Sequence, residues 1–178
     1  MTALLSILAI LFAEAPQAFV DGVPFIRQDP RLCGPAALAS VLAYYGLAVD
    51  QKAIADFAYT EKLGGALMTD LENYARSLGC RTHLAQGTSE DLIDALGKGR
   101  PVVALVDLGF WVFSRPHYVV VTGWGPGGVR AHTGTEADKV FPKEEFERIW
   151  RKRGSVYLLV LPPSPWPGPA APAPPSGS

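Results

Sequence analysis

Apolar residues recur at helical spacing in the first half of the chain. Pro35 suits the first turn of a helix, and the mostly apolar run 36–45 continues it. We predict a second helix from an N-cap at Asp50 to about Tyr59, and a third capped by Thr69. Within the third helix, the apolar positions recur at i, i+3, i+4 and i+7: Leu71, Tyr74, Ala75 and Leu78. Residues 60–66 contain Gly64-Gly65 and are predicted to form a loop.

The second half of the chain has the apolar pattern of strands. Continuous branched or alternating apolar residues predict strands over 80–85, 101–106, 117–124, 129–133 and 155–161, and helices over 89–96 and 143–152. We assign Ser89 as the cap of the first of these helices. The turn Gly125-Pro126-Gly127-Gly128 predicts an antiparallel hairpin between its flanking strands. Helices followed by a mainly antiparallel sheet indicate an α+β fold.

The two ends of the chain differ from its middle. Residues 3–13 are apolar, which is too short for a comfortable bilayer span but matches the core of a signal peptide. Small residues at Ala13, Ala15 and Ala18 offer cleavage positions, although no Lys or Arg precedes the block. We therefore predict a signal peptide over 1–18. A helix that stays with the domain is the alternative.

From Pro162 the sequence is dominated by Pro, Ala, Gly and Ser, which predicts a disordered tail over 162–178. The residues between, 19–161, are enough for one domain with a full core, since 48% of the 178 residues are hydrophobic. With a signal peptide the protein is expected to be periplasmic or extracellular, without an integral span after removal of that peptide. An uncleaved N-terminal segment would instead leave it membrane-associated.

The net charge of −1 provides no basic field for nucleic acid, so we expect no nucleic-acid partner. No metal-ligand spacing is present, and no cofactor is predicted. The chain also has no glycine-rich phosphate-binding loop that ends in Lys-Ser or Lys-Thr. Nothing in the sequence defines the oligomeric state.

Cys33 lies where the first predicted helix begins. Unpaired backbone N–H groups and the positive end of the helix dipole stabilise an anion there, which lowers the pKa of a thiol. A reactive thiol is therefore the favoured interpretation, against a small buried hydrophobe. The second cysteine, Cys80, is interpreted as structural. A disulfide between the two remains open from sequence alone, and it would consume the nucleophile.

A nucleophilic cysteine needs a base, and the chain has three histidines. His83 lies in a short strand without a polar companion, and His132 lies in the return strand of the hairpin. His117 begins a strand directly after the turn residues Ser114-Arg115-Pro116, where its ring can project toward a cleft. His117 is the candidate base. Nearby aromatic residues are candidates for the wall of a peptide groove: Trp111, Phe113 and Tyr118.

Two blocks of residues resemble a known family. They are Gln28 with Cys33-Gly34-Pro35-Ala36-Ala37-Leu38 and Tyr44-Tyr45-Gly46, and then His117-Tyr118-Val119-Val120-Val121-Thr122-Gly123. Over residues 23–161 the chain resembles the double-glycine, bacteriocin-processing cysteine peptidases of the papain-like clan. The resemblance implies a papain-like fold, Cys33 as nucleophile and His117 as general base and acid. It also implies Gln28 as a side-chain donor to the oxyanion hole.

The chain departs from that family where an Asp orients the histidine. Thr133 stands at the equivalent place, and its hydroxyl lacks the charge that stabilises imidazolium. Asp138 is a candidate substitute, and Asp107 is another. The resemblance thus implies a free-standing cysteine peptidase that acts on a peptide or protein through a Cys33 thioester. The alternatives are a weak or inactive peptide-binding domain, and transfer of the acyl group to an amine.

Overall fold

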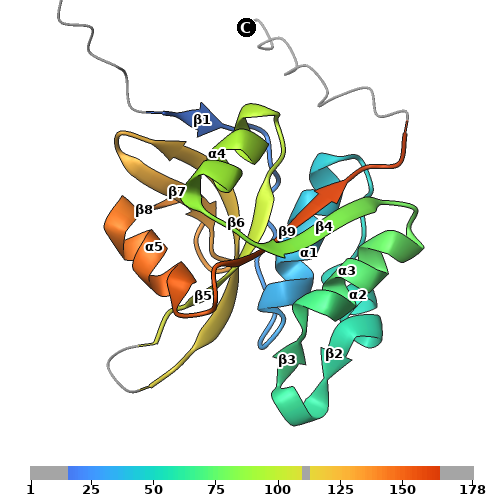
Figure 1. Cartoon of the computed structure of the whole chain (residues 1–178). Coiled ribbons are helices and arrows are strands. Elements are labelled where there is room, and N and C mark those ends of the chain that lie inside the picture. The colour runs from blue at the N-terminus through green and yellow to red at the C-terminus, as the bar shows by residue number, and fades with distance from the viewer. Residues whose placement is uncertain (1–15, 110–112, 165–178) are drawn as a thin grey trace, which may run out of the picture.

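A computed structural model describes residues 16–109 and 113–164 (Figure 1). Most of the predicted signal peptide and most of the predicted tail lie outside the described residues, and so does Trp111. The first strand, β1 (Ala18–Phe19), already includes the last residue of the predicted signal segment. Ala18 in that strand is buried, which places residue 18 within the folded domain.

Five α-helices are described: α1 (Cys33–Tyr44), α2 (Gln51–Ala58), α3 (Met68–Ser77), α4 (Ser89–Gly97) and α5 (Lys143–Arg151). The predicted cap of α2 is confirmed, because the Asp50 carboxylate accepts a hydrogen bond from the Lys52 N–H at 2.7 Å. Two other predicted caps were wrong. Thr69 lies inside the first turn of α3, and Thr88 rather than Ser89 precedes α4. The Asp91 carboxylate accepts from the Thr88 N–H, which satisfies a donor that the helix itself leaves unpaired.

The predicted antiparallel sheet is confirmed. Its strands are β1, β4 (Arg81–Gln86), β5 (Val102–Asp107), β6 (Pro116–Gly125), β7 (Gly128–His132), β8 (Lys139–Phe141) and β9 (Val156–Leu161). The strand order is β4-β9-β5-β6-β7-β8, and every pair is antiparallel. Strand β1 pairs with the C-terminal end of β6, also antiparallel. In Figure 1, α1 to α3 gather on the right of the molecule, and α5 lies on the left beside β7 and β8.

Residues 60–66 were wrongly predicted to be only a loop. They form a hairpin of β2 (Tyr59–Thr60) and β3 (Gly65–Ala66) joined by a short 3-10 helix, η1 (Glu61–Leu63). Gly64 turns the chain with a φ of 63°, a conformation that glycine adopts without steric penalty. Strands of two residues are too short for a period-2 signal, and β8 was missed for a similar reason.

Helix α1 is the central helix of the domain. Leu38, Val41 and Leu42 are fully buried, and the helix contacts α2, α3, β5 and β6. A helix that is apolar on all sides is stable only inside a core. Its N-terminus, and therefore Cys33, is held in place by packing from both the helical side and the sheet side. Within the described residues, no helix is long and apolar enough to span a membrane.

Candidate active site

Cys33 is the first residue of α1. The chain enters the helix through Arg31, which has a left-handed φ of 65°, and Leu32 accepts the first helical hydrogen bond from Ala36. The first N–H groups of a helix have no acceptor within the helix. The thiol is only partly buried, whereas the next residues of α1 are buried. The first turn therefore presents a sulfur atom and unpaired amides at one accessible point.

His117 lies near the start of β6, paired with Val106 of β5. His117 is 6% exposed, and its Nε2 atom lies 2.6 Å from the backbone carbonyl oxygen of Thr133. A carbonyl only accepts, so Nε2 carries the proton and donates. The other ring nitrogen, Nδ1, is thereby left for the Cys33 thiol, to which His117 is hydrogen-bonded.

The chain that leads into His117 is held by Asp107 at the end of β5. Its carboxylate accepts from the Ser114 hydroxyl at 2.6 Å and from the N–H groups of Arg115 and Gly109 at 2.9 and 2.8 Å. The Ser114 hydrogen bond is the largest cause that holds the pKa of Asp107 at about 2. Asp107 thus remains charged and fixes the residues that precede His117, without bonding to the imidazole.

Cys33 and His117 shift each other's protonation in opposite directions. Burial raises the pKa of the Cys33 thiol, but the His117 hydrogen bond and charge and the N–H groups of Tyr118 and Gly34 outweigh it, so that the pKa is lowered. Burial lowers the pKa of His117, but the hydrogen bonds to Cys33 and to the Thr133 carbonyl raise it overall. Both shifts favour a thiolate beside an imidazolium.

The Cys–His pair lies within a stretch of sequence that matches a known family. The sequence model of the Peptidase_C39 like family matches residues 20–158. The chain belongs to this family. The match contains Cys33, His117 and Gln28. It also contains the whole described sheet except β1 and residues 159–161 of β9. A search of curated proteins found no significant match.

Solved structures of C39 peptidase domains have the same fold. A C39-like peptidase from Bacillus anthracis superposes with a TM-score of 0.70 at 23% identity, covering 82% of this chain and 97% of the other. The peptidase domain of Streptococcus ComA, a bifunctional ABC transporter, gives 0.64 at 24%, covering 82% and 98%. The double-glycine-motif protease of an AMS/PCAT transporter, solved with its leader peptide, gives 0.64 at 25%, with the same coverage.

Besides Asp107, the candidates for orienting His117 are Thr133 and Asp138, and the structure places these two in different roles. Thr133 contacts His117 through its backbone carbonyl, while its hydroxyl accepts from the Glu136 N–H at 3.0 Å. Asp138 lies at His132, where its N–H donates to Nδ1 at 3.1 Å and its carboxylate is 3.8 Å from that atom. Among the described residues, no carboxylate is hydrogen-bonded to His117.

Gln28 lies beside the same loop. Its backbone N–H donates to the Gly134 carbonyl at 2.8 Å, and its side-chain Oε1 is buried without a hydrogen-bond partner. An amide whose oxygen is packed in this way has its NH₂ group, on the other branch of Cδ, as the end that is left to donate. That NH₂ group is the donor which the predicted oxyanion role of Gln28 requires.

The remaining cysteine and histidines lie elsewhere. Both cysteines are free, and Cys80 is buried, which raises the pKa of its thiol. His83 is exposed on β4 with its ring 5.8 Å from that of Tyr157. Nε2 of His132 lies 3.0 Å from the Val23 carbonyl, so this buried ring ties the N-terminal segment to β7.

Tyr118 has more contacts at the site than its sequence position indicates. Its N–H reaches the Cys33 sulfur, and its hydroxyl donates to the Ala66 carbonyl at 2.9 Å. A Cβ added to Gly34 would lie 3.0 Å from the Tyr118 ring, so the ring packs tightly on that glycine. The sequence places Tyr118 next to His117 but carries no signal for the contact with Ala66, which is 52 residues away. Tyr118 joins the sheet, the helix α1 and the β2–β3 hairpin.

Removing the Tyr118 hydroxyl tests this junction. In Tyr118→Phe the Ala66 carbonyl loses its donor, so we expect the free energy of unfolding to fall by about 1 to 3 kcal/mol. Urea denaturation monitored by circular dichroism measures the change. Because the Tyr118 N–H remains, the reactivity of Cys33 is expected to stay close to wild type. An unchanged unfolding free energy would show that the hairpin is not held by this bond.

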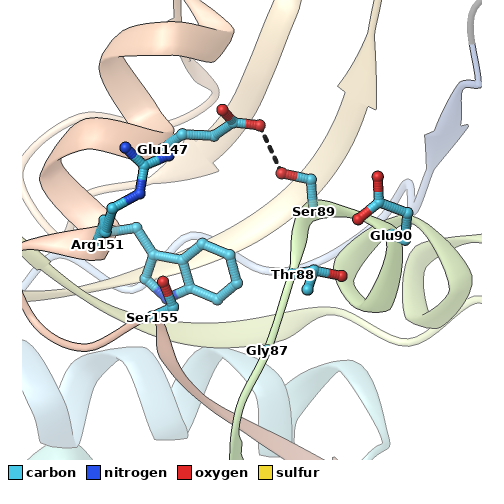
Figure 2. A pocket seen from close by; sticks show the side chains of 8 residues that line it. Gly87, Thr88, Ser89, Glu90, Glu147, Arg151 and Ser155 are labelled. Carbon is cyan, nitrogen blue, oxygen red and sulfur yellow. Dashed lines mark hydrogen bonds between the residues drawn. The ribbon is translucent and has the colours of Figure 1, made fainter.

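Two surface pockets differ in their relation to the pair. The first lies between α4 and α5 and has a volume of about 310 Å³. Figure 2 shows it, with the hydrogen bond that the Ser89 hydroxyl donates to Glu147. None of the predicted site residues lines this pocket. An open depression of about 380 Å³ lies next to Cys33 along the chain. Its lining residues are Pro30, Arg31, Leu32, Ala55, Asp56, Tyr59 and Glu61. The second pocket is the candidate for substrate contacts.

Proposed function

We propose that this protein is a cysteine peptidase in which Cys33 is the nucleophile and His117 is the general base and acid. The observation that carries the proposal is the position of His117, which is held by the Thr133 carbonyl on one nitrogen and hydrogen-bonded to Cys33 on the other. Membership of a peptidase family supports the same reaction class. The thiolate, rather than the thiol, is the nucleophilic form of cysteine.

The reaction follows from these positions. The Cys33 proton passes to Nδ1 of His117, and the sulfur forms a bond to the carbonyl carbon of the substrate. The oxyanion is held by the Cys33 N–H and the Gln28 side-chain NH₂. The imidazolium then protonates the leaving amine as the C–N bond breaks, which leaves a thioester. His117 next takes a proton from water, whose oxygen attacks the thioester and releases the acid and the free thiol.

The substrate we propose is an extended peptide or a protein segment. The open depression is lined by Pro30, Arg31 and Leu32, the three residues that immediately precede Cys33 in the chain, so we propose that residues on one side of the scissile bond lie there. The AMS/PCAT protease, one of the structural relatives, was solved with a leader peptide bound. An extended peptide segment is the form of substrate that such an open surface accepts.

A second candidate, a peptide-binding domain with little or no catalysis, is favoured by the missing carboxylate at His117. A carbonyl oxygen orients the ring and accepts its N–H, but it stabilises the imidazolium less than a negative charge does. Transfer of the acyl group to an amine is the third candidate, because it shares every step up to the thioester.

The pH dependence of Cys33 alkylation by iodoacetamide tests the pair without any substrate. Because the pKa of Cys33 is lowered and that of His117 is raised, the thiolate forms at lower pH than that of a free cysteine, and the imidazolium persists to higher pH than that of a free histidine. We therefore expect rapid alkylation well below the ordinary thiol pKa of about 8.5. Mass spectrometry of Cys33 peptides, from about pH 4 to about pH 9, gives the profile.

The His117→Ala variant is the comparison. Without His117, neither its hydrogen bond nor its charge lowers the Cys33 pKa, so we expect the low-pH plateau to disappear and the alkylation profile to shift toward alkaline pH. Identical profiles for the two proteins, both centred near the free-thiol pKa, would contradict the pair and favour the binding domain. Product analysis of a cleaved peptide in the presence of an added amine separates hydrolysis from acyl transfer.

A further inference from the structure

The turn that follows β7 contacts both His117 and Gln28. Thr133 and Gly134 are consecutive residues, and their two carbonyl oxygens accept from different parts of the site. The Thr133 carbonyl accepts from His117 Nε2 at 2.6 Å, and the Gly134 carbonyl accepts from the Gln28 N–H at 2.8 Å. One peptide unit therefore orients the base, and the next holds the segment that carries the oxyanion donor.

Gly134 lies between these two carbonyls. Its φ of 79° is in the left-handed region, which side chains rarely adopt. The φ and ψ angles of Gly134 set the angle between the Thr133 carbonyl and the Gly134 carbonyl. At that angle, the Thr133 carbonyl reaches His117 and the Gly134 carbonyl reaches the Gln28 N–H.

The Gly134 Cα also packs directly against the Gln28 side chain. A Cβ placed on Gly134 would overlap Gln28 Oε1 and would lie 3.1 Å from Cδ and 3.2 Å from Cβ of Gln28. The overlapped Oε1 is the atom that is buried without a partner. The missing side chain at position 134 is thus what allows Gln28 its position.

The turn is braced internally by Thr133. Its N–H donates to the Glu136 carbonyl at 3.0 Å, and its hydroxyl accepts from the Glu136 N–H at 3.0 Å. The Thr133 side chain is 4% exposed, so water competes little for these bonds. The carbonyl that faces His117 is therefore held by a closed turn.

We propose that Gly134 is a positioning residue that fixes the base His117 and the oxyanion donor Gln28 in one geometry, in place of the carboxylate that orients the histidine in related peptidases. The proposal rests on the function proposed above. Because Gly134 adopts a left-handed conformation, the Thr133 carbonyl accepts from His117 and the Gly134 carbonyl accepts from the Gln28 N–H. The Gly134 Cα packs against the Gln28 side chain.

The test compares Gly134→Ala with Gly46→Ala. Gly46 has a φ of 80°, and a Cβ added to it would have no neighbouring atom within 4 Å, so its replacement carries the same backbone strain without the overlap. We expect Gly134→Ala to lower kcat by about 10² to 10³-fold with little change in KM, as for loss of an oxyanion-hole donor. Gly46→Ala is expected to lower the melting temperature but to leave kcat unchanged.

A double-mutant cycle with Gln28→Ala tests whether the two residues act together. In Gly134→Ala, the overlap with Gln28 Oε1 is what displaces the turn, and with it both His117 and Gln28. Gln28→Ala removes that overlapping atom, so we expect the double variant to lose no more kcat than Gln28→Ala alone and to regain part of the melting temperature. Additive losses in kcat would overturn the proposal. If Gly134→Ala does not fold, the double variant is still expected to fold, and its failure to do so would also overturn the proposal.

Two NMR readouts need no peptidase activity. In Gly134→Ala we expect faster hydrogen exchange of the Gln28 amide and a lower pKa of His117, because its carbonyl acceptor turns away. Neither change is expected in Gly46→Ala. If the wild-type protein cleaves no peptide, the proposed function is contradicted. The hydrogen exchange of the Gln28 amide and the titration of His117 then test the positioning role of Gly134 by themselves. Unchanged exchange and titration in Gly134→Ala would overturn it.

Discussion

Replacing Cys33 with alanine is expected to reduce kcat for peptide cleavage by about 10⁶-fold, the loss seen when the nucleophile of a covalent hydrolase is removed. The reason is that, in the proposed reaction, the Cys33 sulfur makes the covalent bond to the substrate. The measurement is single-turnover cleavage of a fluorogenic peptide by the purified protein. Peptide binding, followed by fluorescence anisotropy, is expected to persist.

The chain offers a matched control in its other cysteine. Cys80 is buried and its thiol pKa is raised, so Cys80→Ala removes a thiol without touching the site. We expect this variant to retain kcat and to show a lower melting temperature from the small cavity. Equal cleavage rates in wild type and Cys33→Ala would refute the peptidase proposal, and a loss confined to Cys80→Ala would show that the reaction had been assigned to the wrong thiol.

The His117→Ala variant is expected to lose about 10² to 10⁴-fold in kcat, the usual range for a positioned general acid and base. The remaining thiol is still at the start of α1, but it lacks the partner that lowers its pKa and protonates the leaving amine. The rate is measured across pH. Wild type should show a bell that rises through the lowered pKa of Cys33 and falls through the raised pKa of His117.

His83→Ala is the control for this variant, because His83 is exposed on β4, where its ring lies edge-on to that of Tyr157. We expect His83→Ala to keep both the kcat and the bell-shaped pH profile of the wild type. A His117→Ala protein that keeps the full bell-shaped profile would show that another group is the base. Loss of activity in both variants would instead indicate a general effect on folding, which the melting temperatures would reveal.

The elements that local pattern predicts well are the long, strongly apolar ones. The helix that begins at Cys33 and the strand that carries His117 were both predicted, since each is a run of about ten residues of one character. The hairpin between β6 and β7 followed from its glycine-rich turn. Short elements such as β1 and β8 were missed because their strand character comes from pairing with a distant strand.

The orienting contact at His117 was the least accessible to sequence reasoning. A motif indicates a side chain at position 133, whereas the structure uses the backbone carbonyl, an atom that every residue possesses. For the same reason Asp138 was a natural candidate from its carboxylate, although the chain turns it toward His132 and Arg130. Backbone atoms carry no residue-type signal, so sequence alone does not distinguish these arrangements.

The sequence by itself predicted the long elements and the candidate reacting groups. A thiol at the start of an apolar helix, an imidazole at the start of a strand, and Gln28 five residues before the thiol are local features of chemistry and spacing. Tertiary structure alone decided what each of them touches: the Thr133 carbonyl at His117, the Tyr118 hydroxyl at Ala66, and the bare Cα of Gly134 at Gln28. These contacts join residues far apart in the chain, and their geometry exists only once the helix and the sheet have packed against each other.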